Sequence, residues 1–382
     1  MSGNLTDFGA LSALQKKIYA AKVIKAGRDD SFWMGEKGFM GRNLSDATKP
    51  IHYVDELTKT TRGTRCVMPL VLDLNKSGTV DDNKLAGNEE PISADSLEIK
   101  VSQLRHAVKE VGALSAQETV IQFRATAKDT LGHWKSEITD ELCFLVASGI
   151  TFDKTMTGGT RTDYDADDQL AQLRFNSDVV APSSERKVFA GGVAATNALT
   201  VNDKMSWNLL VTANTKAKRK RLKPIRMKGG KYFVVVMSTE QSRDLKGDND
   251  YRTIVAGAGN RGSKNELFTG SFAMVDGLIL YDHNRVYNTM DAASGSKWGA
   301  SGTVDGAQAL LLGAQAIGYA HIGEDKWGEA DDTDYGNAQG ISYGCMIGLI
   351  KAVFKSRYDK DSNGNTTQQD FSIISIYTAA KK

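Results

Sequence analysis

A long hairpin followed at once by a long helix occupies residues 63–149 and constrains the fold more than any other stretch. The predicted strands are Cys66–Leu74 and Leu97–Val101, the second continuing toward Val108, because apolar and polar residues alternate along both. Between them, Asn75–Asp95 is rich in glycine, asparagine and acidic residues. So polar a tip has little apolar surface to pack on its own domain. The hairpin therefore predicts a partner surface, which indicates a protein that works by assembling.

The predicted helix covers Ala116–Ser148 and would be about 50 Å long at about 1.5 Å per residue. Ser115 and Glu118 fit a capping box at its start, and Gly149 fits a C-cap at its end. Glycine costs helix stability, so Gly132 predicts a bend or a close contact. The apolar residues recur every three or four positions and form one stripe: Val120, Phe123, Ala127, Leu131, Trp134, Ile138, Leu142 and Leu145.

The remaining segments alternate between apolar elements and polar loops. Helical spacing predicts a helix over Ala10–Gly27 with Gly27 as its C-cap, followed by an extended arm to Arg62. Polar Phe152–Thr200 predicts surface loops with a short helix near Ala166–Phe175. The later apolar runs predict buried strands at Tyr232–Met237 and Gly277–Tyr281, a helix at Ser238–Lys246, an apolar element at Ala307–Tyr319, and a closing hairpin of Gly344–Phe354 with Phe371–Tyr377.

Bulk composition excludes several classes of protein. The chain has 382 residues and a net charge of +2, so it is not globally a polyanion binder. No apolar run is long enough for a membrane span, and the N-terminus lacks the pattern of a secretory signal. The three cysteines are far apart and fit neither a disulfide framework nor a metal site, which suits synthesis in a reducing cytoplasm.

Two motifs resemble ligand-binding loops without their usual context. Gly257–Gly262 matches the glycine pattern of a dinucleotide site, but Tyr251–Ala256 before it is only a weak strand, which favours a plain glycine loop. The second motif, Asp359–Asp370, has calcium-loop spacing, with strand-like flanks and an aspartate at the last position, which favours a hairpin turn. The weak candidate ligands are Asp359, Asp361, Asn363, Asn365 and Asp370.

Opposite charges gather in two segments. A basic run between Lys216 and Lys231 predicts either contact with nucleic acid or an acidic protein surface, or a solvated loop; its central residues are Lys218, Arg219, Lys220, Arg221 and Lys223. The hairpin tip is acidic, and the candidate intersubunit residues there are Leu72, Leu74, Asp81, Asp82, Leu85, Glu89 and Glu90. No catalytic constellation is present, so we expect a protein that is not an enzyme.

Several short motifs follow one another from Gly63 onward. They are Gly63-Thr-Arg before Met68-Pro-Leu-Val-Leu, Leu85-Ala-Gly87-Asn-Glu89-Glu90, Val101-Ser-Gln103-Leu-Arg105, Leu131-Gly-His-Trp134, Asn265-Glu-Leu267-Phe268-Thr-Gly270, Ala309-Leu-Leu-Leu-Gly313-Ala-Gln315-Ala316 and Tyr335-Gly336-Asn337. In this order the motifs resemble the major capsid proteins of tailed bacteriophages with the Hong Kong 97-type fold, especially the coliphage N-four-like branch. Residues 1–62 and 152–200 match less clearly.

The resemblance implies an α+β fold with the parts of that family. They would be an N-terminal arm (1–62), an E-loop hairpin (63–108), a P-domain (109–204) with the spine helix 116–148, an A-domain (205–340), and return strands of the P-domain (341–382).

The resemblance also implies a structural role without cofactors. Hexamers and pentamers would form the icosahedral head of a tailed phage around double-stranded DNA, assembled in the cytoplasm of a bacterial host. Scaffolding, portal and decoration proteins would be partners, and membranes would not. One alternative is a shell of the same fold that carries protein cargo. Another, from a different class, is a nucleotide- or calcium-binding enzyme.

Overall fold

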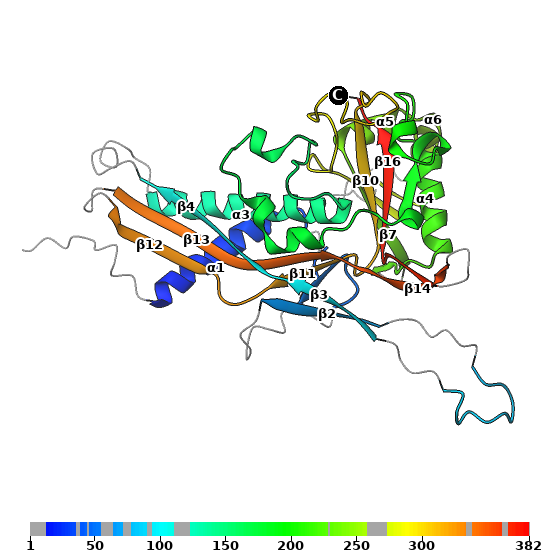
Figure 1. The fold of residues 1–382 in the computed structure, drawn as a ribbon, viewed down its shortest axis with the longest axis horizontal. Helices are drawn as coiled ribbons and strands as arrows, with labels where there is room; N and C mark the ends of the chain where they lie inside the picture. Colours follow the sequence, from blue (N-terminus) through cyan, green and yellow to red (C-terminus); the bar gives the residue numbers. More distant parts are fainter. Residues whose placement is uncertain are drawn as a thin grey trace, which may run out of the picture.

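Two sheets organise the chain in the computed structural model (Figure 1). A five-stranded sheet lies along the length of the molecule, and a seven-stranded sheet stands at one end. The structure describes residues 13–35, 39–43, 46–54, 64–71, 78–89, 94–110, 123–227, 230–257, 273–333, 338–360 and 366–381.

The five-stranded sheet, here called the spine sheet, is built around the long strand β13 (Ala338–Lys351). Strands β11 (Ile317–His321) and β12 (Lys326–Thr333) pair with β13 one after the other along the same edge. Strand β4 (Ser102–Lys109) pairs along the opposite edge, and β1 (Ile51–Val54) adds to β11 in parallel. One long strand therefore joins segments from both halves of the sequence.

Helix α3 (Phe123–Ser148) packs on one face of the spine sheet and carries the predicted apolar stripe. Ala127, Leu131, Leu142 and Leu145 on this stripe are buried. The predicted beginning of the helix, residues 116–122 with the Ser115 capping box, lies outside the described residues.

Helix α1 (Ala13–Asp30) crosses α3 at a pair of glycines. A Cβ atom on Gly27 would lie 2.9 Å from the carbonyl oxygen of Gly132, and one on Gly132 would lie 3.0 Å from the Cβ of Ala26. The close contact predicted at Gly132 is confirmed. The C-cap predicted at Gly27 is wrong, because α1 continues to Asp30 and this glycine lets two helix backbones approach.

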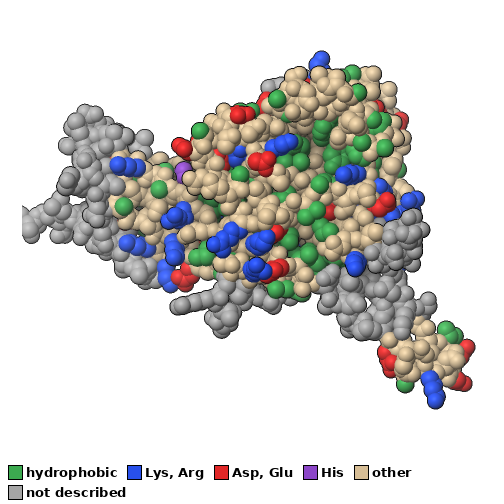
Figure 2. Space-filling view, in the orientation of Figure 1, with side chains coloured by type: hydrophobic (Ala, Val, Ile, Leu, Met, Phe, Trp, Pro, Cys, Tyr) green, Lys and Arg blue, Asp and Glu red, His purple; other side chains and the backbone are tan. Residues whose placement is uncertain are grey.

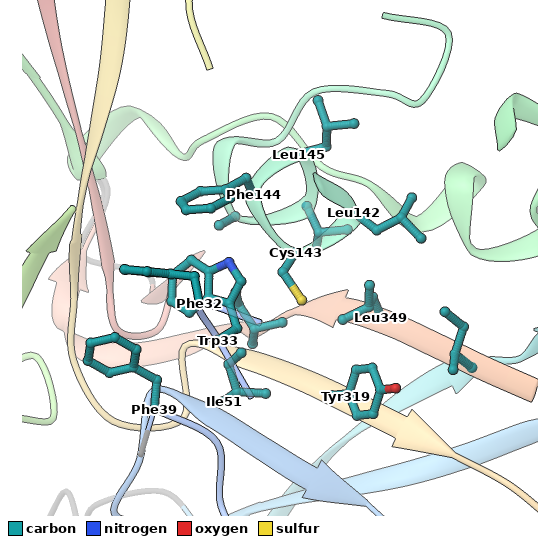
Figure 3. Packing of buried hydrophobic residues seen from close by; sticks show 14 of the residues in the cluster. Phe32, Trp33, Phe39, Ile51, Leu142, Cys143, Phe144, Leu145, Tyr319 and Leu349 are labelled. Atoms are coloured by element: carbon teal, nitrogen blue, oxygen red, sulfur yellow. The ribbon is translucent and has the colours of Figure 1, made fainter. Parts of the chain in front are cut away.

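The segment after α1 is built into the core instead of lying over it as an extended arm. Phe32 and Trp33 are buried beside Phe144 of α3, as Figure 3 shows. Asp140 of α3 holds this turn by accepting hydrogen bonds from Ser31 Oγ at 2.6 Å and from the Phe32 amide at 2.7 Å. Burial raises the pKa of the Asp140 carboxyl despite these bonds.

The seven-stranded sheet contains the most apolar strands of the chain. Its strand order is β5-β16-β10-β7-β9-β8, with β6 paired to β7. The buried strands predicted at Tyr232–Met237 and Gly277–Tyr281 are confirmed as β7 and β9. The bounds are β5 Lys187–Phe189, β6 Ile225–Met227, β7 Gly230–Met237, β8 Ala273–Val275, β9 Leu278–Asp282, β10 Gly306–Leu312 and β16 Ile373–Ala379.

Three helices cover one face of this sheet: α4 (Trp207–Arg219), α5 (Thr239–Gly247) and α6 (Asn249–Gly257). The opposite face packs on the C-terminal end of α3, so one core joins the two sheets. The helix predicted after Ser238 is confirmed as α5, with a capping box between Ser238 and Gln241.

The C-terminal strands divide between the two sheets, which corrects the predicted closing hairpin of Gly344–Phe354 with Phe371–Tyr377. Strand β16 belongs to the seven-stranded sheet and not to the spine sheet. All its residues are buried, so it needs neighbours on both edges, which β10 and β5 supply. The hairpin is instead the short pair β14 (Val353–Lys360) and β15 (Thr366–Asp370).

Two other segments also differ from expectation. The apolar run Ala307–Tyr319 is two strands, β10 and β11, that lie in different sheets. Residues 152–200 hold short 3₁₀ helices in place of the predicted helix near Ala166–Phe175. Phe152 and Phe175 from this polar stretch are fully buried and pack edge to face, with ring centroids 5.4 Å apart.

Candidate intersubunit surfaces

The base of the predicted hairpin is anchored on the chain's own spine sheet. Strands β2 (Arg65–Val71) and β3 (Ala94–Lys100) pair antiparallel, as predicted. Their inward side chains Cys66, Met68 and Ile99 are buried against the face of the spine sheet opposite α3. The expectation that the hairpin needs a partner surface is therefore wrong for its base. The second arm also does not continue to Val108 within the hairpin, since β4 belongs to the spine sheet.

Two glycines of the spine sheet allow the hairpin to lie this close. A Cβ atom on Gly348 would lie 2.4 Å from the carbonyl oxygen of Lys100, and one on Gly318 would lie 2.8 Å from Met68 Sδ. Lys100 adds an ion pair with Asp178 at 2.5 Å. The direction in which the hairpin leaves the body is therefore set by backbone contact and by charge.

The outward face of the hairpin is exposed. Val67 is 50% exposed, and Arg65 and Glu98 form an exposed ion pair at 2.8 Å. Within the described residues, β2 and β3 form a two-stranded sheet of their own, so each has one edge without a partner strand. Free strand edges and an exposed apolar side chain are typical of a surface that another chain covers.

The hairpin tip, residues 78–89, extends away from the body and is held together by its own hydrogen bonds (Figure 1). The side-chain amide of Asn83 donates to the Val80 carbonyl at 2.8 Å, and that of Asn88 donates to the Lys84 carbonyl at 2.9 Å. The Asn88 backbone amide also donates to the Leu85 carbonyl at 2.9 Å. Two consecutive turns thus give the tip a defined shape.

The tip presents apolar and acidic side chains side by side. Val80 is 64% exposed and Leu85 is 61% exposed, and Asp81, Asp82 and Glu89 are exposed as well. Four of the predicted intersubunit residues therefore lie on the tip, while Leu72, Leu74 and Glu90 lie outside the described residues. The sequence analysis missed Val80; its apolar side chain next to two aspartates in a turn was the available signal.

The basic run is spread over the end of α4 and the turn before β6, and much of it is paired within the chain. Lys218 lies 3.7 Å from Asp276, and Lys220 lies 3.1 Å from Glu185. Lys223 donates to the side-chain oxygen of Gln315 at 2.5 Å. Arg219 and Arg221 are exposed. The run is therefore partly structural, because Lys218, Lys220 and Lys223 have partners within the chain.

Lys223 also influences a buried histidine of the spine sheet. His52 of β1 is buried, with Nδ1 3.2 Å from Gln315 Nε2. Burial lowers the pKa of His52, the charge of Lys223 lowers it further, and Asp46 acts in the opposite direction. The folded chain therefore binds this proton less readily than the unfolded chain.

We expect His52 to make the chain sensitive to acid. Neutral His52 fits the buried site, so its contribution to stability is complete above the pKa of about 6.5 in the unfolded chain. This contribution decreases as the pH falls below that value, because the unfolded chain takes up the proton first. Urea unfolding between about pH 7 and pH 5 should show a stability loss steeper for wild type than for His52→Gln, by up to about 1.4 kcal/mol per pH unit. Equal slopes for the two proteins would contradict this assignment.

The described parts of the two ligand-loop motifs differ from what their ligands require. Residues 251–256 are part of helix α6, not the strand predicted there, so no strand leads into Gly257; residues 258–262 lie outside the described part of the chain. Asp370, the last candidate calcium ligand, is buried in an ion pair with Lys351 at 3.1 Å. Asp361, Asn363 and Asn365 lie outside the described residues, as does the side chain of Asp359.

The described residues offer few other candidate sites. They contain no group of three or more metal-binding side chains, and no helix among them is long and apolar enough to cross a bilayer. All three cysteines are free and buried, and burial raises the pKa of Cys66 to about 11. The exposed hairpin and the sheet faces that no described element covers are thus the candidate surfaces for contact with another molecule.

Comparison with known proteins agrees with an assembly role. Residues 8–382 match the family described as phage capsid protein. The chain is 35% identical to the major capsid protein of Pseudomonas phage KPP25 over 388 residues, which covers 100% of this chain and 99% of that protein.

Solved capsids share the fold. The capsid of Ralstonia phage GP4 superposes with a TM-score of 0.74 and 25% identity, covering 93% of this chain and 92% of that one. The Cyanophage Pam1 capsid gives a TM-score of 0.65 and 19% identity, covering 90% and 91%. The predicted α+β Hong Kong 97-like fold is confirmed, and the chain belongs to the phage capsid protein family, in which it is a major capsid protein of a tailed phage.

Proposed function

We propose that copies of this chain form hexamers and pentamers that close into an icosahedral head around double-stranded DNA. The observation that carries this proposal is the hairpin tip, which is shaped by its own turns and exposes Val80 and Leu85. In a monomer, two large apolar side chains would stay in water near strand edges without partner strands, and such a surface favours aggregation. Contact with a neighbouring copy would cover this surface.

Many such contacts per subunit explain how the shell becomes stable. A closed shell repeats the hairpin contact around every capsomer, so weak contacts add up. The spine sheet holds the hairpin base by close backbone contact at Gly348, so each copy presents its tip in a similar direction. Assembly in the cytoplasm of a bacterial host, with scaffolding, portal and decoration proteins as partners, follows as part of this proposal, as does membership of the N-four-like branch.

We further propose a division of the chain into the parts of the capsid fold. The predicted boundaries are an arm at 1–62, an E-loop at 63–108, a P-domain at 109–204, an A-domain at 205–340 and return strands at 341–382. The strand pairing supports a narrower E-loop, β2 to β3, and supports adding β16 to the A-domain sheet.

Electron microscopy of the expressed full-length chain tests the proposal. We expect closed particles from wild type and none from a variant in which residues 78–89 are replaced by a short glycine-serine linker. The variant should keep its melting temperature, because nearly all side chains of the tip are exposed. Normal shells from this variant would overturn the assignment of the tip.

The nucleic acid content of purified phage heads separates this proposal from a cargo shell of the same fold. Double-stranded DNA inside the particle supports a phage head. Particles that enclose protein and no DNA would support the alternative.

A further inference from the structure

Residues 313–316, here called the crossing, join β10 of the seven-stranded sheet to β11 of the spine sheet. Backbone hydrogen bonds hold the crossing from both sides. The Ala314 amide donates to the carbonyl of Lys223, in the turn that leads into β6 of the seven-stranded sheet, at 2.8 Å. The Gln315 amide donates to the carbonyl of Lys49, just before β1 of the spine sheet, at 2.8 Å. The crossing is therefore one of the places that set the relative position of the two sheets.

Gln315 has an unusual backbone and a buried side chain within the crossing. Its φ is +55°, in the left-handed region that residues other than glycine rarely adopt. Its side chain contacts one partner from each side: Lys223 Nζ lies 2.5 Å from Oε1, and His52 Nδ1 lies 3.2 Å from Nε2. Figure 2 shows many Lys and Arg side chains at the surface, whereas Lys223 is half-buried and turns its ammonium toward Gln315. A strained backbone persists where its surroundings hold it, and these two contacts contribute to that hold.

The chemistry of Lys223 fixes the direction of the hydrogen bonds that run through Gln315. An ammonium group can only donate, so the Gln315 atom beside it is the oxygen, and the atom beside His52 is the NH₂ nitrogen. That nitrogen donates, so Nδ1 of His52 accepts and the proton of the neutral ring is on Nε2. His52 is 1% exposed, and its Nε2 has no hydrogen-bond partner among the described residues.

A second proton on His52 does not fit this arrangement. It would bind at Nδ1 and face the NH₂ group of Gln315, and the amide cannot turn round because Lys223 holds its oxygen. The hydrogen bond between His52 and Gln315 would be lost, and two positive charges would lie near each other. Proton uptake by His52 and an intact crossing are therefore in conflict.

The other groups around His52 do little to relieve this conflict. Burial lowers the pKa of His52 most, Lys223 lowers it further, and Asp46 raises it. The residue opposite His52 on β11 is Gly318, which has no side chain. The hairpin side chains buried on this face of the sheet are apolar residues and Cys66, and burial raises the pKa of the Cys66 thiol to about 11. Among the described residues, Asp46 is thus the charged group that favours the proton.

We propose that Lys223, Gln315 and His52 form a proton-controlled lock on the crossing. With His52 neutral, the lock holds the spine sheet and the seven-stranded sheet in one relative position. When acid protonates His52, its contact with Gln315 breaks and the crossing is released from the spine sheet. The lock lies within one folded subunit, so the proposal does not depend on assembly, and its failure would leave the proposed function standing.

The proton affinity of His52 tests the polarity of the lock. Deuterium exchange at the imidazole Cε1 position, followed by mass spectrometry over a pH series, reports on each histidine of the full-length chain. We expect His52 of wild type to bind its proton more weakly than an unfolded histidine does. Gln315→Glu should raise this affinity at least about tenfold, because a carboxylate accepts from Lys223 and from protonated Nδ1 at once. Lys223→Met should raise it as well, since the amide of Gln315 can then turn its oxygen toward His52.

Lys220→Met is the matched control for the loss of a lysine. Lys220 precedes the same turn and pairs with Glu185 at 3.1 Å. Its replacement should leave the proton affinity of His52 unchanged. If Lys220→Met and Lys223→Met had equal effects, general charge and not the hydrogen-bond chain would set the affinity.

Amide hydrogen exchange across the crossing tests the release itself. In wild type, peptides that contain residues 315–317 should lose protection at least about tenfold over the pH range in which His52 takes up its proton, after correction for the intrinsic pH dependence of exchange. Strand β7 should keep its protection over this range. His52→Gln and Gln315→Glu should both keep the crossing protected in acid, because neither creates two opposed donors. Circular dichroism at neutral pH establishes that each variant is folded.

Wild type alone can overturn the proposal, even if a variant does not fold. Proton uptake by His52 without any change in exchange at residues 315–317 would show that the histidine only fills space. A His52 that binds its proton as strongly as an unfolded histidine would contradict the fixed polarity of the hydrogen bonds.

Discussion

Replacing Asp370 by asparagine should cost the folded chain about 3–5 kcal/mol, because it leaves the buried charge of Lys351 without its partner. The two side chains lie 3.1 Å apart and are 1% and 0% exposed. Burial lowers the pKa of Lys351, and Asp370 counteracts this. The measurement is urea unfolding of wild type and variant at neutral pH.

The position of the pair explains the size of the effect. Lys351 ends β13 in the spine sheet, and Asp370 ends β15 just before β16 of the seven-stranded sheet. Asp370 also accepts hydrogen bonds from the Ser183 hydroxyl at 3.0 Å and from the Ser183 amide at 3.1 Å. The pair therefore joins the two sheets where the chain passes from one to the other.

Two comparisons isolate the buried charge as the cause. The double change Lys351→Met with Asp370→Asn removes both charges and should recover most of the loss. Glu98→Gln, which breaks the exposed pair with Arg65, should cost less than about 1 kcal/mol. A double variant as unstable as Asp370→Asn would show that packing, not charge, sets the cost.

Because Asp370 is paired with Lys351, it is not free to bind a cation. Added calcium should therefore leave the melting temperature of wild type unchanged.

Gly348→Ala should displace the hairpin base from the spine sheet and lower the free energy of unfolding by about 1–3 kcal/mol, because the added methyl group overlaps backbone atoms. Its Cβ would lie 2.4 Å from the Lys100 carbonyl oxygen and 2.9 Å from Ile99 Cγ2. Strand β3 must move away, and Met68 and Ile99 lose part of their contact with the spine sheet. Hydrogen exchange should show weaker protection in β2 and β3, and particle yield should fall because the tip no longer points in its native direction.

Gly340→Ala is the matched control on the same strand. Among the described residues, its Cβ would have no neighbour nearer than 3.9 Å, so the stability change should stay within about 0.5 kcal/mol. If the two alanine variants behaved alike, the close approach at Gly348 would not be what seats the hairpin. Because both are glycine-to-alanine changes in β13, loss of backbone freedom in the unfolded state is similar for both.

Local patterns in the sequence were sufficient for several elements. The stripe on α3, the capped helix α5 and the all-apolar strand β7 could be predicted because periodicity and capping depend only on neighbouring residues. Helix α6 was mistaken for a strand, since Tyr251–Ala256 has β-branched residues whose helical face packs on the core only in three dimensions.

The candidate surfaces were predicted less completely than the elements. The acidic tip was found from composition, but Val80 was not. Whether one apolar side chain is exposed depends on which residues pack on it in the folded chain. The exposed cations Arg105, Lys109 and Lys326 are dispersed in the sequence and form no run, so composition did not single them out. The basic run that composition did find is partly paired with Asp276 and Glu185.

The sequence by itself determined the hairpin, the long helix and, through the order of its motifs, the capsid fold. Those features depend on residue spacing along the chain. Only the tertiary structure decided that the hairpin base packs on the chain's own sheet while the tip stays free. The physical reason is long-range: Gly348 and Gly318 must come beneath Ile99 and Met68 to seat the base, and no pattern within the hairpin encodes that contact.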